Sequence, residues 1–349
     1  MNKFKKLNNI VGWAVFLIAT TVYLSTMERT ASLWDCGEFI AAAYKLEVVH
    51  APGAPFFLLL GRIFSLFAAD ASQVAMMINS LSALASSFTI LFLFWTITAF
   101  GRKIYLSGKE TSELGFEMEG KNVKKSNILA VLGAGVVGSL AYTFSDSFWF
   151  SAVEGEVYAL SSFFTAITFW CILKWEQAYE TKNAAKWLVL IAYLIGLSIG
   201  VHLLSLLTIP AMGMIYHFKR NKGRVSRGEK IMPEPLGSII AFLLSSFILV
   251  FIQGILIPKI ASLMGWFDKT LVNEYNLPFY SGVALFLVIT FGLIIFGLFY
   301  TKKKMKNAII NTVLLCILFL LIGYSSYATV LVRSNTNTPI NIGSPELIF

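Results

Sequence analysis

Charged residues are scarce in this sequence. Only 13% of its 349 residues are Asp, Glu, Lys or Arg, whereas 57% are hydrophobic and the mean hydropathy is +0.72. A soluble domain carries about 25% charged residues. The composition therefore excludes a soluble globular protein and indicates an integral membrane protein.

Cysteine is also rare, and familiar nucleotide or hydrolase motifs are missing. Of the three cysteines, Cys171 and Cys316 fall within expected spans and only Cys36 lies in a loop, so we expect no intrachain disulfide and no metal site at ligand spacing. The chain has no Walker loop, dinucleotide fingerprint, HExxH or GxSxG. A soluble nucleotide donor therefore has no visible binding site.

Long hydrophobic runs, in contrast, fill the chain. A membrane span needs roughly 20 apolar residues, with a range of about 17–25. This length predicts nine spans, of which the fifth and sixth are short. The first follows a basic N-terminus without a clean cleavage site, so we expect a retained signal-anchor helix. The expected spans are residues 9–27, 74–100, 127–145, 158–175, 186–201, 203–218, 236–257, 279–300 and 307–331.

The apolar segment 56–69 is too short to count as a span, and it carries Arg62 at its middle. We expect an interfacial or re-entrant helix there. If this segment does not cross, all but six of the 28 Lys and Arg residues share one side with the N-terminus. The positive-inside rule makes that side cytoplasmic. Its loops are 101–126, which we expect to be solvated and mobile, 176–185, 219–235 and 301–306.

Membrane orientation thus explains the net charge of +9, and nucleic acid is excluded as a partner. The opposite, outer side holds most of the acidic residues. Its two main polar segments are the first outer loop, residues 27–73, and the second outer loop, residues 146–157.

The first outer loop contains the most chemically suggestive residues. Asp35 and Glu38 are three residues apart, which places both side chains on one face of a helix. His50 follows and opens the rigid turn His50-Ala-Pro-Gly-Ala-Pro55. One carboxylate is a candidate general base for a hydroxyl acceptor, and the other a candidate ligand of sugar, acceptor or metal. The alternative is that Asp35 caps a surface helix and His50 packs in a loop.

Five further candidates lie on the same side. Glu154, Glu156 and Tyr158 fall in or beside the second outer loop, where acids alternate with aromatic residues. His202 falls between two short spans, and an ionisable group at that depth is a functional candidate by default. Arg333 follows the last span and suits phosphate binding. The alternatives are an aromatic belt, an interhelical hydrogen bond and a lipid-headgroup contact.

These residues resemble a family. Asp35-Cys-Gly-Glu38-Phe-Ile-Ala-Ala-Ala-Tyr44 with His50-Ala-Pro52-Gly-Ala-Pro55 resembles the first-loop signature of GT-C membrane glycosyltransferases related to the animal plexin-type protein O-mannosyltransferase, a group with long bacterial members. Later matches are Phe148-Trp149-Phe150 with Glu156-Val-Tyr158, Gly196 to His202, and Arg333 followed by Pro339-Ile-Asn341. The resemblance covers residues 30 to 341, nearly the whole chain.

The resemblance implies an all-α GT-C bundle of about nine transmembrane helices with an outer juxtamembrane helix in the first loop. Residues 1–333 would form the catalytic domain, and residues 334–349 would begin an outer C-terminal region that family members carry at greater length. The membrane would be a bacterial inner membrane, with the N-terminus cytoplasmic and the active site on the periplasmic face.

The resemblance also implies a reaction. A polyprenyl-phosphate-linked sugar, expected to be mannose, would be transferred with inversion to Ser or Thr of an exported protein. Asp35 would be the base and Glu38 and Glu156 supporting acids. His50 and His202 would line the pocket, with Glu154 and Tyr158 beside them, and Arg333 would hold the phosphate. A divalent cation is left open as a cofactor.

Two alternatives remain from the sequence. The same fold could glycosylate a lipid or a cell-wall glycan, which nothing in the residues distinguishes. A membrane transporter or scaffold would place charged residues within the spans near the midplane. The spans here are nearly free of charge, which favours an enzyme acting at one membrane face.

Overall fold

The computed structural model describes residues 3–106, 125–229, 231–336 and 338–342. Most of the expected 101–126 loop and residues 343–349 of the expected C-terminal region therefore lie outside the described residues. Within these ranges the chain is helical, and its β-structure is one isolated parallel bridge between Val48 and Asn341. The prediction of an all-α integral membrane protein is confirmed.

Seven helical stretches among the described residues are long and apolar enough to cross a membrane. Four of them are the helices α1 (Lys3–Thr26), α4 (Val74–Leu106), α5 (Lys125–Thr143) and α7 (Val157–Ala178). The fifth is α10 (Glu234–Phe251), which continues through a short π-helix (Ile252–Leu256) into α11 (Ile257–Tyr275). The sixth is α12 (Ser281–Tyr300) with a π-turn (Thr301–Met305), and the seventh is α13 (Ala308–Tyr324), which continues through a 3-10 turn (Ser325–Tyr327) into α14 (Ala328–Ser334).

The expected count of nine spans is not confirmed. The fifth and sixth expected spans correspond to α8 (Ala184–Ile199) and α9 (Thr208–Ser226). The first is only 16 residues long, and the second half of α9 is strongly basic. A 3-10 turn, Leu203–Leu207, separates them, so the residues predicted to begin the sixth span form this turn instead.

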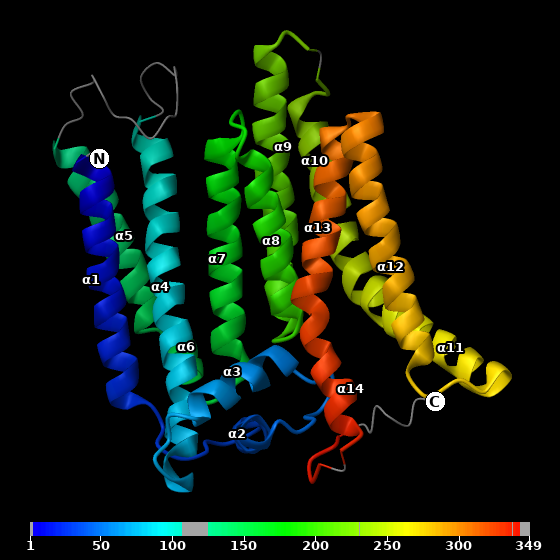
Figure 1. The fold of residues 1–349 in the computed structure, drawn as a ribbon. Coiled ribbons are helices and arrows are strands. Elements are labelled where there is room, and N and C mark those ends of the chain that lie inside the picture. The colour runs from blue at the N-terminus through cyan, green and yellow to red at the C-terminus, as the bar shows by residue number, and fades with distance from the viewer. Residues whose placement is uncertain (1–2, 107–124, 230, 337, 343–349) are drawn as a thin grey trace.

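Figure 1 shows the long helices side by side, with α2 (Cys36–Lys45) and α3 (Pro55–Ser65) lying across one end of the bundle. We call this the α2–α3 end. The N-terminus and the connections α7–α8, α9–α10 and α12–α13 lie at the opposite, basic end (Figure 1). The position of α3 across one end therefore agrees with the prediction that residues 56–69 do not form a span.

The short helices are fixed to the bundle by a continuous apolar core. Ala43 of α2, Phe57 of α3 and Ile78 of α4 are fully buried within it. A Cβ on Gly61 of α3 would come within 2.8 Å of the Ala43 Cβ, so α2 and α3 cross at very close range. Close crossing at a small residue fixes the mutual position of two helices. This packing gives the first loop a rigid base.

The remaining short elements complete the α2–α3 end. A 3-10 turn, Ala71–Gln73, precedes α4, and α6 (Asp146–Ala152) occupies half of the expected second outer loop. In contrast, α10, α12 and α13 expose apolar side chains such as Leu243, Val250 and Phe296 along their length. Such a surface fits contact with lipid tails.

Candidate active site

Asp35 and Glu38 begin α2 but have different surroundings. Asp35 occupies the N-cap position, yet its side chain makes no capping hydrogen bond and is 54% exposed. The preceding Trp34 has a φ of 61° and a largely exposed ring. A left-handed conformation is costly for a bulky residue and is found mostly where surrounding structure enforces it, commonly at functional sites. Capping therefore does not account for Asp35.

The turn after α2 brings His50 back over the start of the same helix. Its backbone N–H donates to Glu38 Oε1 at 2.7 Å, and its Nδ1 lies 3.0 Å from Glu38 Oε2. The other ring nitrogen, Nε2, lies 4.0 Å from Asp35 Oδ2. Phe39 packs edge-on against the imidazole. The structure thus brings the three candidate residues Asp35, Glu38 and His50 together.

The second loop places two buried acids beside this group. Glu154 and Glu156 are each only 6% exposed, and within the described part of the chain Glu156 Oε2 has no hydrogen-bond partner. Burial, with the negative charges of Glu154 and Asp35, raises the pKa of the Glu156 carboxyl to about 7. Burial and the negative charges of Glu154 and Glu156 raise the pKa of the Cys36 thiol to about 12. Cys36 is therefore a neutral group next to the acids.

Backbone contacts hold the two loops together. The Glu28 N–H donates to the Val153 carbonyl at 2.9 Å, and the Asn79 amide of α4 donates to the carbonyls of Glu28 and Thr30. A Cβ on Gly155 would approach the Asn79 Oδ1 to 2.7 Å, so only glycine allows this approach. The acids of the second loop are thus held against the first loop.

Tyr158 and His202 form a second pair. Their ring centroids are 5.3 Å apart, and Tyr158 remains 44% exposed. His202 Nδ1 accepts the Leu204 N–H at 3.2 Å, and burial lowers the pKa of the imidazole. The Gly200 carbonyl accepts the Phe56 N–H at 2.7 Å, which places this turn beside the start of α3. His202 is thus a neutral histidine that caps the 3-10 turn.

Arg333 lies at the other end of α2. Its Nε donates to the Leu46 carbonyl at 2.6 Å and one terminal nitrogen to the Lys45 carbonyl at 3.0 Å. Ten helical residues, about 15 Å at 1.5 Å per residue, separate these carbonyls from Asp35. The structure therefore does not bring Arg333 next to the Asp35 group.

Arg333 instead shares an open cleft with Arg62, which the sequence did not single out as a site residue. The cleft has a volume of about 610 Å³ and also contains the buried Glu47. Arg62 donates to the Tyr44 carbonyl at 2.7 Å and lies over the Tyr44 ring. An arginine in the middle of an apolar segment is the sequence signal that could have identified it.

The Asp35 group could also hold a divalent cation. One ligand atom from each of Asp35, Glu38 and His50 lies within 4.8 Å of the others. Carboxylates and imidazole suit several divalent metals. In the described geometry, however, Glu38 is already bonded to His50, so a cation would have to compete with that contact.

Comparison with known proteins agrees with the resemblance. The family model for the protein O-mannosyl-transferase TMEM260 N-terminal domain matches residues 35–225, more than half of the chain. The matched region contains every candidate residue except Arg333.

Two curated relatives carry the same description. The chain is 25% identical over 207 residues to protein O-mannosyl-transferase tmem260 of Dictyostelium discoideum, covering 56% of this chain and 22% of that protein. It is 28% identical over 187 residues to protein O-mannosyl-transferase TMEM260 of Mus musculus, covering 53% and 22%. The chain thus spans about a fifth of the length of the curated relatives it matches. No solved structure matches the chain. On the family match, this chain belongs to the TMEM260 N-terminal domain family.

Proposed function

We propose that this chain is a protein O-mannosyltransferase domain that uses a polyprenyl-phosphate-linked mannose. The names of the relatives support mannosyl transfer to protein, and the absence of a nucleotide-binding motif supports a lipid-linked donor. The proposed acceptor is a Ser or Thr hydroxyl of an exported protein. The α2–α3 end would face the outer side of the membrane, the periplasm if the membrane is a bacterial inner one.

The observation that carries the proposal is the unequal setting of the two carboxylates on α2. Glu38 is held by two contacts from His50, whereas Asp35 is exposed and makes no capping hydrogen bond. A general base needs such a free carboxylate within reach of the acceptor hydroxyl. We therefore assign Asp35 as the base and Glu38 as the residue that positions His50.

The proposed reaction is one displacement at the anomeric carbon. The acceptor oxygen bonds to that carbon while its proton passes to Asp35. The bond from the carbon to the phosphate oxygen breaks, and polyprenyl phosphate leaves with the electron pair. The anomeric configuration is inverted. Charge on the departing phosphate would be met by a cation, with Arg333 assigned to that task.

The assignment of Arg333 carries a conformational requirement. Its guanidinium is bonded to carbonyls at the far end of α2. To contact the phosphate of a donor whose sugar lies at Asp35, Arg333 would have to release these two carbonyls. Glu154, Glu156, Tyr158 and His202 would line the acceptor side of the site. A cation held by Asp35, Glu38 and His50 would polarise the phosphate when bound.

Replacement of the proposed base tests the function. Asp35→Asn keeps the size of the side chain and removes the proton acceptor, so transfer should fall by about 10²–10⁴-fold. The assay is transfer from polyprenyl-phosphate mannose to an exported protein in proteoliposomes, with the product linkage identified by NMR. Asp146→Asn, an exposed acid of α6 at the same end, is the matched control. Retention of transfer by Asp35→Asn would reject Asp35 as the base, and a glycolipid product alone would reject the protein acceptor.

A further inference from the structure

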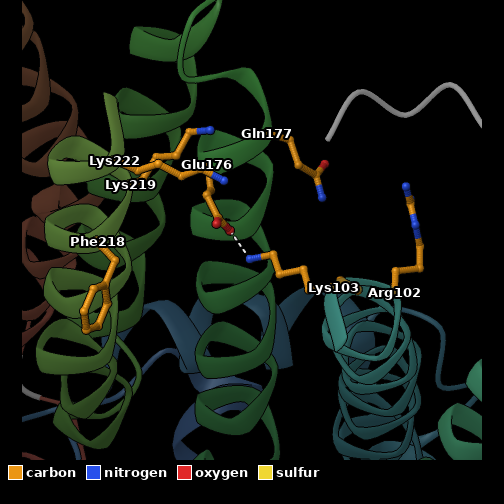
Figure 2. Close-up of a pocket in the computed structure, with 8 residues that line it drawn as sticks. Arg102, Lys103, Glu176, Gln177, Phe218, Lys219 and Lys222 are labelled. Carbon is orange, nitrogen blue, oxygen red and sulfur yellow. Dashed lines mark hydrogen bonds and ion pairs between the residues drawn. The ribbon is translucent and has the colours of Figure 1, made fainter. Parts of the chain in front are cut away.

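A second cleft lies at the basic end, between α4, α7 and α9 (Figure 2). Its volume is about 160 Å³, roughly five times the ~30 Å³ that a water molecule occupies in the liquid. The space is sufficient for a tetrahedral phosphate group. None of the candidate residues of the α2–α3 end contributes to it.

The walls of this cleft carry an excess of positive charge. Arg102 and Lys103 come from α4, and Lys219 and Lys222 from α9. Glu176 of α7 forms an ion pair with Lys103 (Figure 2). Within the part of the chain that the structure describes, neither Lys219 nor Lys222 is paired with an acid.

The length of α7 gives the position of the cleft along the membrane normal. Glu156 occupies the N-cap position of this helix at the candidate active site, and Glu176 lies in its last turn. Twenty residues at 1.5 Å each give a separation of about 30 Å, the thickness of the hydrocarbon core of a bilayer. If Glu156 is at one membrane boundary, the cleft is at the headgroup level of the opposite leaflet.

One wall of the cleft is apolar. Phe218 lines it and is 49% exposed, and Ala99 lies deeper on α4. Below them α4 and α7 continue as hydrophobic spans. A soluble anion would gain nothing from this wall, whereas a lipid could place its phosphate among the lysines and its acyl chains along the helices. Basic pockets between membrane helices bind anionic headgroups elsewhere.

We propose that the cleft between α4, α7 and α9 is a binding site for the phosphate of an anionic membrane phospholipid. Lys219 and Lys222 are the principal ligands, and the Lys103–Glu176 pair positions α4 against α7. The site is separate from the proposed mannosyl transfer, which takes place about one membrane thickness away.

The test compares two lysine pairs at the same end. Lys219→Gln with Lys222→Gln removes two charges from the cleft. Lys302→Gln with Lys304→Gln removes two exposed charges from the α12–α13 connection. Phosphatidylglycerol is titrated into the full chain in detergent micelles, and bound lipid is counted by native mass spectrometry. At about 1 kcal/mol per lysine, affinity should fall roughly five-fold for each charge and about thirty-fold for the cleft pair.

The control pair should bind phosphatidylglycerol as the unmodified chain does, and phosphatidylcholine should bind weakly to all variants. Equal losses for the two pairs would overturn the site, because they would show a general surface attraction. Inorganic phosphate that binds as well as the lipid would overturn the lipid assignment. Thermal melting of each variant without added lipid checks that it is folded. If the double variant fails to fold, the exposed Lys222→Gln alone should still lose about five-fold.

Discussion

At the scale of single residues, neighbouring acids at the α2–α3 end have different surroundings. Glu38 accepts a hydrogen bond from the His50 N–H, whereas Glu156 is buried beside Glu154 and, within the described residues, its Oε2 has no hydrogen-bond partner. Burial disfavours the charged form of a carboxyl, and a like charge adds to that effect. Glu156 is therefore a neutral group over much of the acidic range, while Asp35 is in contact with water.

This difference predicts a pH effect on stability. The pKa of Glu156 is about 7 in the folded chain and 4.5 in a model peptide. Between these pH values the Glu156 carboxyl is ionised in the unfolded chain but protonated in the folded chain. The free energy of unfolding therefore falls as pH rises, by about 1.4 kcal/mol per pH unit and about 3 kcal/mol in total. Above pH 7 the loss levels off. Thermal melting of the detergent-solubilised chain from pH 4.5 to 8, in chelator, measures it.

Glu156→Gln should remove this slope and leave a higher melting temperature at pH 8. Glu274→Gln, an exposed acid of α11, should keep the slope of the unmodified chain. Parallel melting profiles for Glu156→Gln and the unmodified chain would contradict the buried neutral carboxyl.

The sequence predicted some of these residue-scale features. The spacing of Asp35 and Glu38 predicted one shared helix face, and the proline-rich turn made His50 a candidate, with packing in a loop as the alternative. The burial of Cys36 next to Glu154 and Glu156 was not predicted, because it depends on docking between loops more than a hundred residues apart. The position of Arg333 on the Lys45 and Leu46 carbonyls was not predicted for the same reason.

At the scale of elements, small residues control how closely helices approach. A Cβ on Gly196 of α8 would lie 2.2 Å from the Leu320 carbonyl oxygen of α13, and one on Gly323 would lie 2.5 Å from the Tyr193 carbonyl oxygen. Glycines at such positions allow helix backbones to pack tightly inside a membrane. The α8–α13 contact therefore depends on both glycines.

Gly196→Ala should force α8 and α13 apart. We expect a loss of about 1–3 kcal/mol of stability, typical of overpacking, seen as a lower melting temperature in detergent. Gly292→Ala in α12 meets no atom within 4 Å and should leave melting unchanged or raise it slightly, since alanine favours a helix. Equal melting of the two variants would argue against close packing at Gly196.

The helix boundaries show which elements could be predicted from sequence patterns. Apolar length predicted most spans, and the short segment 56–69 predicted a helix that does not cross, which is α3. The helix α6 was not predicted, because seven residues with acids and aromatics carry no periodic signal. The start of α9 at Thr208 was also missed, since the preceding apolar run favours a span and not a 3-10 turn.

At the scale of the whole molecule, the two ends of the bundle differ in chemistry. The α2–α3 end holds the proposed base and the buried acids, and the basic end holds the lysine cleft. On the positive-inside rule we propose that the basic end is the cytoplasmic one. The separation of these ends by about one hydrocarbon thickness along α7 is consistent with their lying at opposite faces of the membrane.

Chemical labelling tests the orientation. In a chain whose Cys36, Cys171 and Cys316 are replaced by alanine, Asp70→Cys should react with a membrane-impermeant maleimide in intact cells. Lys303→Cys should react only after permeabilisation. Both positions are exposed, so access to the reagent depends on the side of the membrane. The reverse pattern would place the proposed active site in the cytoplasm.

The bridge between Val48 and Asn341 has a consequence for biosynthesis. The Val48 N–H donates to the Ile340 carbonyl, and the Ile342 N–H returns to the Val48 carbonyl, each at 3.0 Å. All residues up to Ile342 must leave the ribosome before these partners can meet. A nascent chain halted before residue 340 would have inserted its helices but would lack this closure. The α2–α3 end would therefore be closed only after the helices between residues 48 and 340 have been synthesised.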